Sequence, residues 1–173
     1  NIPRGQRRTY LTHVAFICDA PDVQVTLPQV IIANEHTVKA RDLAALRSAC
    51  PPHVELLREK SAWVNAPILA RIVRWLAAWL APFLGEYQPM LLFDAAKPHI
   101  SGLFAACARA RIWPLLVPAK VTWLLQPLDT HAFFRYKFHI MKAYQAARVR
   151  AIDGDVGIAE LMTCINDGIR LIL

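Results

Sequence analysis

The chain has little of what marks several common classes of protein. Only 6 of its 173 residues are glycine, and no glycine-rich loop follows an expected strand, which disfavours a nucleotide-binding α/β enzyme. Its 4 cysteines lie far apart without a Cys-x-x-Cys pair, so we expect reduced thiols and no zinc cluster. The longest apolar run, residues 75–84, has 10 residues and contains Pro82, whereas a bilayer span needs roughly 20. We therefore expect no membrane-spanning segment and no membrane partner.

The start of the chain also lacks a secretory signal. The first four residues, Asn-Ile-Pro-Arg, include no initiator Met, and no apolar core of a signal sequence follows them. We expect a nuclear or otherwise intracellular protein that is not secreted, and a piece of a longer chain.

What is present favours a compact, basic protein. Hydrophobic residues make up 55% of the chain and charged residues 19%, a composition typical of one globular domain over residues 1–173. The net charge is +7 and the isoelectric point is near 9.6, so the surface should attract polyanions. Nucleic acid is the first partner that this charge indicates, and an anionic membrane surface the second.

Periodicity predicts alternating strands and helices behind an N-terminal antiparallel hairpin. The expected strands are 10–18, 26–32, 89–93 and 112–117, and the expected helices are 39–49, 66–84, 100–107, 129–151 and 157–173. Residues 34–62 have mixed polarity and are expected to be a variable insert. Trp63, Trp75 and Trp79 are expected in the core. This order of elements predicts an α/β fold with a mixed sheet.

Two aspartates stand at the ends of expected elements. Asp94 ends the apolar run 89–93, and Asp129 follows a proline and opens a helical pattern, with 34 residues between the two. Carboxylates brought together at one sheet edge are suited to hold Mg²⁺. Read locally, however, Asp94 could simply end a strand and Asp129 could be a helix N-cap.

These segments resemble a known family. Leu91-Leu-Phe-Asp94-x4-His99, the spacer of 34 residues, and Leu124-Leu-Gln-Pro-Leu-Asp129 are similar to the second and third acidic positions of mariner/pogo-type DDE transposases. The hairpin strand Leu27-Pro-Gln-Val-Ile-Ile32 and the turn Ser61-Ala-Trp-Val-Asn65 are also similar, so the resemblance covers residues 7–140. It implies a DDE superfamily endonuclease domain with an RNase H-like fold.

The resemblance implies metal-dependent cleavage and transfer of DNA strands. Asp94 and Asp129 would be the catalytic residues and the ligands of Mg²⁺ or Mn²⁺. His99, Ala95 and Gln126 would line the site. The partner would be DNA, as transposon ends and target, and a homo-oligomer is a further expectation.

The sequence departs from the family at two points. The Asp-Glu-(Thr/Ser)-Gly block that carries the first catalytic aspartate is absent from this chain, which is therefore expected to be N-terminally truncated and inactive or nearly so. Ala95 stands where a polar residue usually follows the second aspartate. Asp19 is a conceivable substitute for the missing carboxylate, but it lies in the expected hairpin turn. The alternative is a domesticated, non-catalytic DNA- or protein-binding module that retains the fold.

Basic residues suggest where DNA would lie. The expected helix at 130–150 has 5 cations and no acid. The candidates for contact with the DNA backbone are Lys97, Arg135, Lys137 and Lys142. Such contacts would be made to phosphates, without sequence specificity. The alternative is a solvated helix face, whose cations favour the C-terminal end of the helix dipole.

Overall fold

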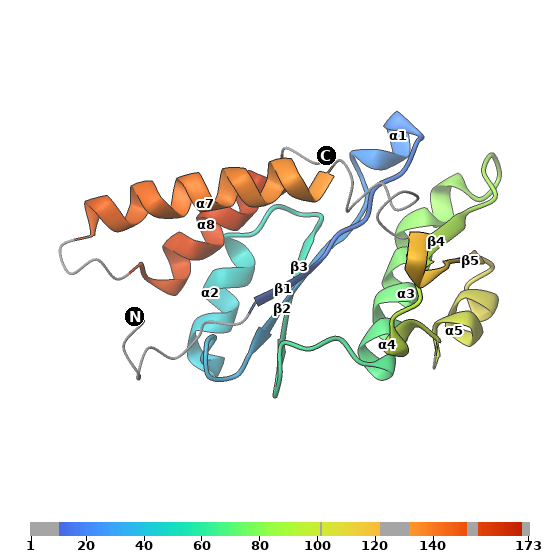
Figure 1. Cartoon of the computed structure of the whole chain (residues 1–173), viewed down its shortest axis with the longest axis horizontal. Helices are drawn as coiled ribbons and strands as arrows, with labels where there is room; N and C mark the ends of the chain where they lie inside the picture. The colour runs from blue at the N-terminus through green and yellow to red at the C-terminus, as the bar shows by residue number, and fades with distance from the viewer. Residues whose placement is uncertain (1–10, 101, 122–131, 152–155, 171–173) are drawn as a thin grey trace.

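The computed structural model describes residues 11–100, 102–121, 132–151 and 156–170, and they form a mixed α/β structure (Figure 1). The first sheet has the strand order β1-β2-β3. Its strands are β1 (Leu11–Val14), β2 (Gln29–Asn34) and β3 (Val54–Glu59). β1 runs antiparallel to β2, whereas β3 runs parallel to it. The central strand β2 is a continuous apolar run because both of its faces are buried.

Short helices connect these strands. α1 (Pro21–Gln24) lies between β1 and β2, and η1 (Ala40–Asp42) and α2 (Leu43–Ser48) lie between β2 and β3. The parallel pairing of β2 with β3 requires such a crossover connection.

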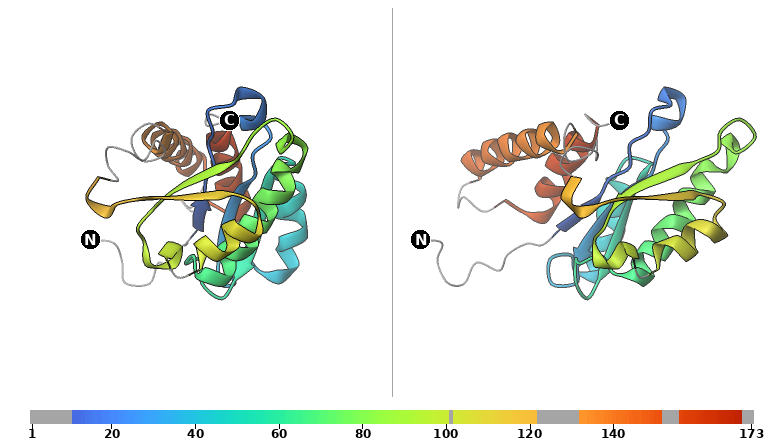
Figure 2. Two further views of the ribbon diagram at one scale, coloured as in Figure 1. Left: turned by 90° about the vertical axis from the view of Figure 1, so that its right-hand side faces the viewer. Right: turned by 45° about the vertical axis from the view of Figure 1, so that its right-hand side comes forward.

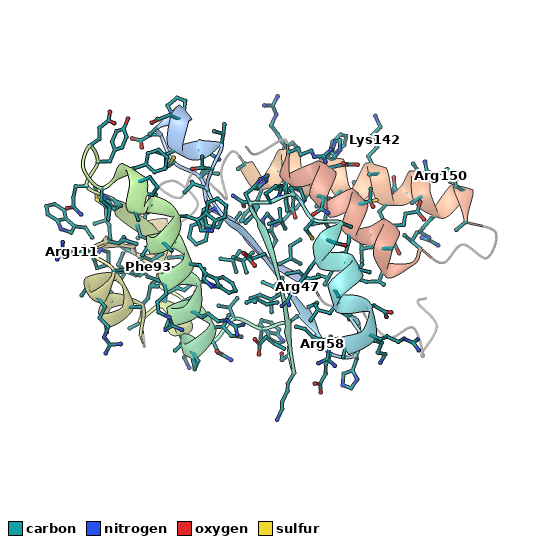
Figure 3. All side chains as sticks on the ribbon, turned by 180° about the vertical axis from the view of Figure 1, so that it is seen from behind. Arg47, Arg58, Phe93, Arg111, Lys142 and Arg150 are labelled. Carbon is teal, nitrogen blue, oxygen red and sulfur yellow. The ribbon has the colours of Figure 1, made fainter. Side chains whose placement is uncertain are left out.

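The helix α3 (Ala66–Leu80), extended by η2 (Ala81–Phe83), is the layer that both sheets share. Ile68 and Ile72 pack in one cluster with residues of β2 and β3. Leu69, Val73 and Leu76 pack in another cluster with Phe93 of the second sheet, and Figure 3 shows Phe93 beside α3. Among the described residues, Ala66–Phe83 is long and apolar enough to cross a membrane by length and composition. Five residues of α3 are buried against the two sheets: Ile68, Leu69, Ile72, Val73 and Leu76.

The second sheet consists of two parallel strands, β4 (Met90–Asp94) and β5 (Trp113–Val117). The chain passes between them through α4 (Lys97–Ile100) and α5 (Leu103–Arg109), and η3 (Ala119–Val121) follows β5. Arg111, in the turn before β5, has φ 56°, a left-handed conformation that non-glycine residues seldom adopt.

Two helices near the C-terminus, α7 (Phe133–Arg150) and α8 (Ile158–Ile169), cover the other face of the first sheet together with α2. They cross closely at Gly168, where an added Cβ would lie 2.8 Å from Cγ1 of Ile140. Figures 1 and 2 show α7 and α8 on one side of the molecule, and β5 and α5 on the other.

Several predicted elements are confirmed with adjusted ends. The antiparallel hairpin, the helices at 39–49, 66–84 and 157–173, and the strands at 89–93 and 112–117 correspond to observed elements. The first strand is shorter than predicted, since β1 ends at Val14. β2 begins at Gln29, later than predicted, because the amide and hydroxyl of Thr26 both donate to the carbonyl of Val23 and prolong the turn of α1.

Three predictions are wrong in part. The region expected to be an insert, 34–62, contains β3, which pairs with β2 along its whole length. Strands expected in one mixed sheet form two sheets among the described residues. Trp63, expected in the core, is 80% exposed in the turn before α3.

Candidate metal site at the end of strand β4

Asp94 is the last residue of β4 and lies opposite Val117, the last residue of the parallel strand β5. The carboxyl ends of parallel strands are where α/β proteins place ligands, because the chain turns away there and leaves side chains accessible. The side chain of Asp94 is 34% exposed, which is open enough for a cation and still shielded by protein. The local sequence therefore presents a carboxylate at the edge where the resemblance expects one.

The carboxylate of Asp94 is held by two groups that follow it in the chain. The amide of Ala96 donates to Oδ1 at 3.2 Å. Nδ1 of His99 is within hydrogen-bond distance of the same oxygen and also lies 3.1 Å from the carbonyl oxygen of Asp94. For Oδ1 and the carbonyl oxygen of Asp94 to accept a hydrogen bond from His99, its Nδ1 must carry the proton. Among the described residues, Oδ2 is the oxygen left through which this carboxylate would bind a metal ion.

His99 is fixed by a second contact. Its ring meets the ring of Phe93 edge-on, with centroids 5.8 Å apart, and Phe93 is itself 5% exposed in the core. The imidazole is therefore oriented by a buried aromatic residue on one side and by Asp94 on the other. The structure places His99 against Asp94, and its role in lining a metal site stays a prediction.

The other predicted lining residues have different positions. Ala95 is partly buried directly after Asp94, and its methyl group offers no hydrogen bond beside the carboxylate. Lys97 is exposed at the first position of α4, close in sequence to the site. Asp129 and Gln126 lie outside the described residues, so the separation of the two aspartates stays a prediction.

The described residues contain no group of three or more His, Cys, Asp or Glu side chains that would hold a metal ion. One carboxylate and one imidazole supply fewer ligands than Mg²⁺ takes, so Asp94 and His99 are part of a site at most. Asp19 does not complete it. Asp19 precedes α1 in the connection between β1 and β2, and it belongs to no group of potential metal ligands among the described residues.

The candidate DNA contacts on α7 are exposed. Arg135, Lys137 and Lys142 are all open to solvent, and the ammonium group of Lys137 lies 5.4 Å from the centroid of the Phe133 ring. Lys142 and Arg150 project from α7 in Figure 3, and Arg150 pairs with Glu160 of α8 at 3.1 Å. α7 is thus a basic helix with part of its charge already paired inside the protein.

The cysteines do not suggest covalent catalysis. Cys18, Cys50, Cys107 and Cys164 are all free thiols, and burial raises the pKa of each. A raised thiol pKa leaves less of the nucleophilic thiolate at neutral pH.

A polar contact in the first sheet, between His13 and Gln29, was not predicted from the sequence. His13 Nε2 lies 3.1 Å from Oε1 of Gln29, and the ring of His13 packs against Tyr136 of α7 with centroids 4.9 Å apart. Gln29 also bonds the backbone of Phe16 through both ends of its amide. The only signal in the sequence is a polar residue set among apolar neighbours in each strand, which is equally typical of a strand with one exposed face.

Comparison with known proteins adds no relative. No family model, no curated protein and no solved structure matches the chain.

Proposed function

We propose that this chain is part of a DDE-type transposase or endonuclease of RNase H-like fold, acting on DNA with Mg²⁺ or Mn²⁺. The observation that carries the proposal is the position of Asp94 at the carboxyl end of a parallel strand pair, with its carboxylate oriented by His99. In this proposal Asp129, at the start of the segment leading into α7, supplies the second carboxylate.

The split of the strands into two sheets is compatible with an RNase H-like sheet that is incomplete. α3 packs on both sheets, and in this proposal the two sheets would belong to one layer. Both β1 and β4 are edge strands among the described residues, and each keeps an unpaired row of backbone groups. A strand between them would join the sheets, and the upstream segment carrying the missing first aspartate would fill that place.

Each residue would then have a defined task. Divalent ions bound between carboxylates activate the attacking oxygen and stabilise the leaving oxygen of a phosphodiester. Asp94 would hold the ion through Oδ2, while His99 and the amide of Ala96 fix the rotation of the carboxylate. Lys97 and the exposed cations of α7 would contact phosphates and position the DNA.

A binding experiment tests the site without requiring full activity. Mn²⁺ is added to ¹⁵N-labelled protein, and we expect paramagnetic broadening to centre on the amides of residues 94–99. Asp94→Asn should abolish this broadening, and His99→Ala should weaken Mn²⁺ binding about tenfold because it loosens the carboxylate. Asp42→Asn, which removes a carboxylate from the start of α2, is the matched control and should change nothing. If the same amides are still broadened in the Asp94→Asn variant, the proposed site is refuted.

Catalysis is tested by nicking of supercoiled plasmid in Mg²⁺ or Mn²⁺. We expect little or no nicking by residues 1–173, and metal-dependent nicking by a chain extended upstream with the missing acidic block. Robust nicking by residues 1–173 alone would contradict the need for a third carboxylate.

The second candidate is a non-catalytic DNA- or protein-binding module that retains the fold. Ala95 favours it, because the hydrogen-bonding side chain expected beside Asp94 is replaced by a methyl group. This alternative predicts DNA affinity that falls with salt, is equal with and without divalent metal, and is unchanged by Asp94→Asn.

A further inference from the structure

Helix α7 is apolar on two opposite faces. Tyr136 and Ala147 are buried, and Phe133 and Ile140 pack beside them against α8 and the first sheet. On the opposite side, large apolar side chains point outward at spacings of 4, 3 and 8 residues, which places them along one face of the helix. These residues, here named the α7 stripe, are Phe134 (74% exposed), Phe138 (57%), Met141 (52%) and Val149 (88%). α7 is thus apolar on its buried face and along this stripe, with charged residues between the two, and an exposed apolar stripe of this kind is a typical interaction surface.

The two-stranded sheet has a matching bare surface. Side chains alternate along β4 and β5, so Leu91, Phe93 and Leu116 pack toward α3 and α5 in the core. Their neighbours point the other way and form cross-strand pairs, here named the open sheet face: Met90 (60% exposed) with Trp113 (64%), and Leu92 (37%) with Leu115 (48%). The first sheet has helices on both faces. On the second sheet, Val117 is on the same side as Trp113 and Leu115 but is 2% exposed, so the bare part of this face is the four residues Met90, Leu92, Trp113 and Leu115.

The charges around the two surfaces are complementary. Arg135, Lys137 and Lys142 flank the α7 stripe, and α7 contains no acidic residue. The open sheet face has acidic groups at both ends of its first strand. Asp94 ends β4 and Glu86 precedes its first residue by four positions, whereas the exposed cations Arg111 and Lys120 flank β5, so the complementarity is with the β4 side of the face.

One molecule does not join its own two surfaces. α7 is held against the first sheet by Tyr136 and Ile140, and its stripe faces away from that contact. In Figure 1, α7 lies on the other side of the molecule from β4 and β5. We propose that the chain self-associates, with the α7 stripe of one copy lying on the open sheet face of a second copy. In this contact a helix would cover the second face of the second sheet, as helices already cover both faces of the first sheet.

The surface involved is large enough for a specific contact. Aromatic side chains bury about 150–250 Å² each, so the exposed parts of these eight residues amount to something on the order of 1,000 Å² per contact. A reciprocal exchange between two copies forms the contact twice and falls in the range of stable interfaces. The pairing of cations with acids would orient the two copies and raise the association rate constant more than it would raise the affinity.

Sedimentation velocity of the whole chain over about 5–500 µM tests the proposal. We expect association that increases with concentration. The product is either a closed dimer or an open, head-to-tail oligomer in which the same contact repeats. Phe138→Asp on the α7 stripe and Leu115→Asp on the open sheet face should each raise the dissociation constant about tenfold or more. Trp63→Asp is the matched control, since Trp63 is 80% exposed but belongs to neither surface.

Mixing the two variants gives the decisive result. Phe138→Asp keeps an intact open sheet face and Leu115→Asp keeps an intact α7 stripe, so the mixture should form a heterodimer through one contact. Met141→Lys and Trp113→Lys form a second pair for the same mixing experiment if either first variant has lost its circular dichroism spectrum. A wild-type chain that stays monomeric, association that survives both substitutions, or a mixture that stays monomeric would each overturn the proposal.

Discussion

The most constrained side chain outside the candidate site is His13. Burial lowers the pKa of His13 from 6.5 to about 4, although its hydrogen bond to Gln29 acts in the opposite direction. Its Nδ1 has no hydrogen-bond partner among the described residues, and its ring packs against Tyr136, whose own pKa is raised by burial. Protonation of His13 would therefore place an uncompensated charge between β1 and α7.

His13 should make the protein less stable in mild acid. The pKa is lower in the folded state than in the unfolded state, so the unfolded chain binds more protons between pH 6.5 and 4, and the free energy of unfolding falls as the pH falls through this range. The full loss is about 3 kcal/mol. Urea unfolding at pH 7.5 and 4.5 should show a smaller loss for His13→Leu than for wild type.

Gln29 keeps two hydrogen bonds when His13 is replaced. Leucine in place of His13 leaves the amide of Gln29 bonded to the backbone of Phe16, so the variant loses the titrating group without stripping Gln29 of its partners. His36→Gln is the control, because His36 is exposed. Equal pH dependence in His13→Leu and wild type would show that His13 does not titrate in this range.

Sequence reasoning located Asp94 better than it located the buried residues. The carboxylate at the end of an apolar run is a local signal, and the structure places it at the end of β4 beside His99 as expected. Gln29, which is fully buried, and Trp63, which is 80% exposed, were not foreseen. Burial depends on which distant segment packs against a side chain, and no local pattern carries that information.

At the scale of elements, the long helices were easier to predict than the short helices α1 and α4 and the strand β3. α3 follows from apolar residues at intervals of three and four, from Pro67 in its first turn, and from Asn65, whose Oδ1 accepts the amide of Ile68 at 3.0 Å. β3 was missed because its inward residues face two different cores, Val54 and Leu56 on one side and Leu57 on the other. The resulting sequence has neither the alternation of a half-exposed strand nor a continuous apolar run.

The N-cap of α3 should contribute measurably to stability. Asn65→Ala removes the oxygen that accepts the amide of Ile68, and we expect it to lower the free energy of unfolding by about 1 kcal/mol. Asn65→Asp keeps an acceptor at this position and should retain most of the stability. Urea unfolding at pH 7.5 measures both. If alanine and aspartate have the same effect, the cap does not contribute.

At the scale of the whole molecule, the division into two sheets could not be predicted. Each strand was expected to enter a mixed sheet, but pairing depends on hydrogen bonds between segments that are distant in sequence. α3 joins the two sheets by inserting Ile72 into one core and Leu76 into the other. The connection between β1 and β2 contributes as well, because Phe16 packs against both cores.

This shared helix should make the two sheets unfold together. Ile72→Ala and Leu76→Ala each remove a buried side chain, 1% and 3% exposed, and each should cost about 2–5 kcal/mol. Native-state hydrogen exchange should show the same loss of protection at Ile31 in β2 and Phe93 in β4, whichever residue is replaced. Arg74→Ala, at an exposed position of α3, is the control and should stay within about 0.5 kcal/mol of wild type. Loss confined to β4 in Leu76→Ala would mean that the sheets are separate cooperative units.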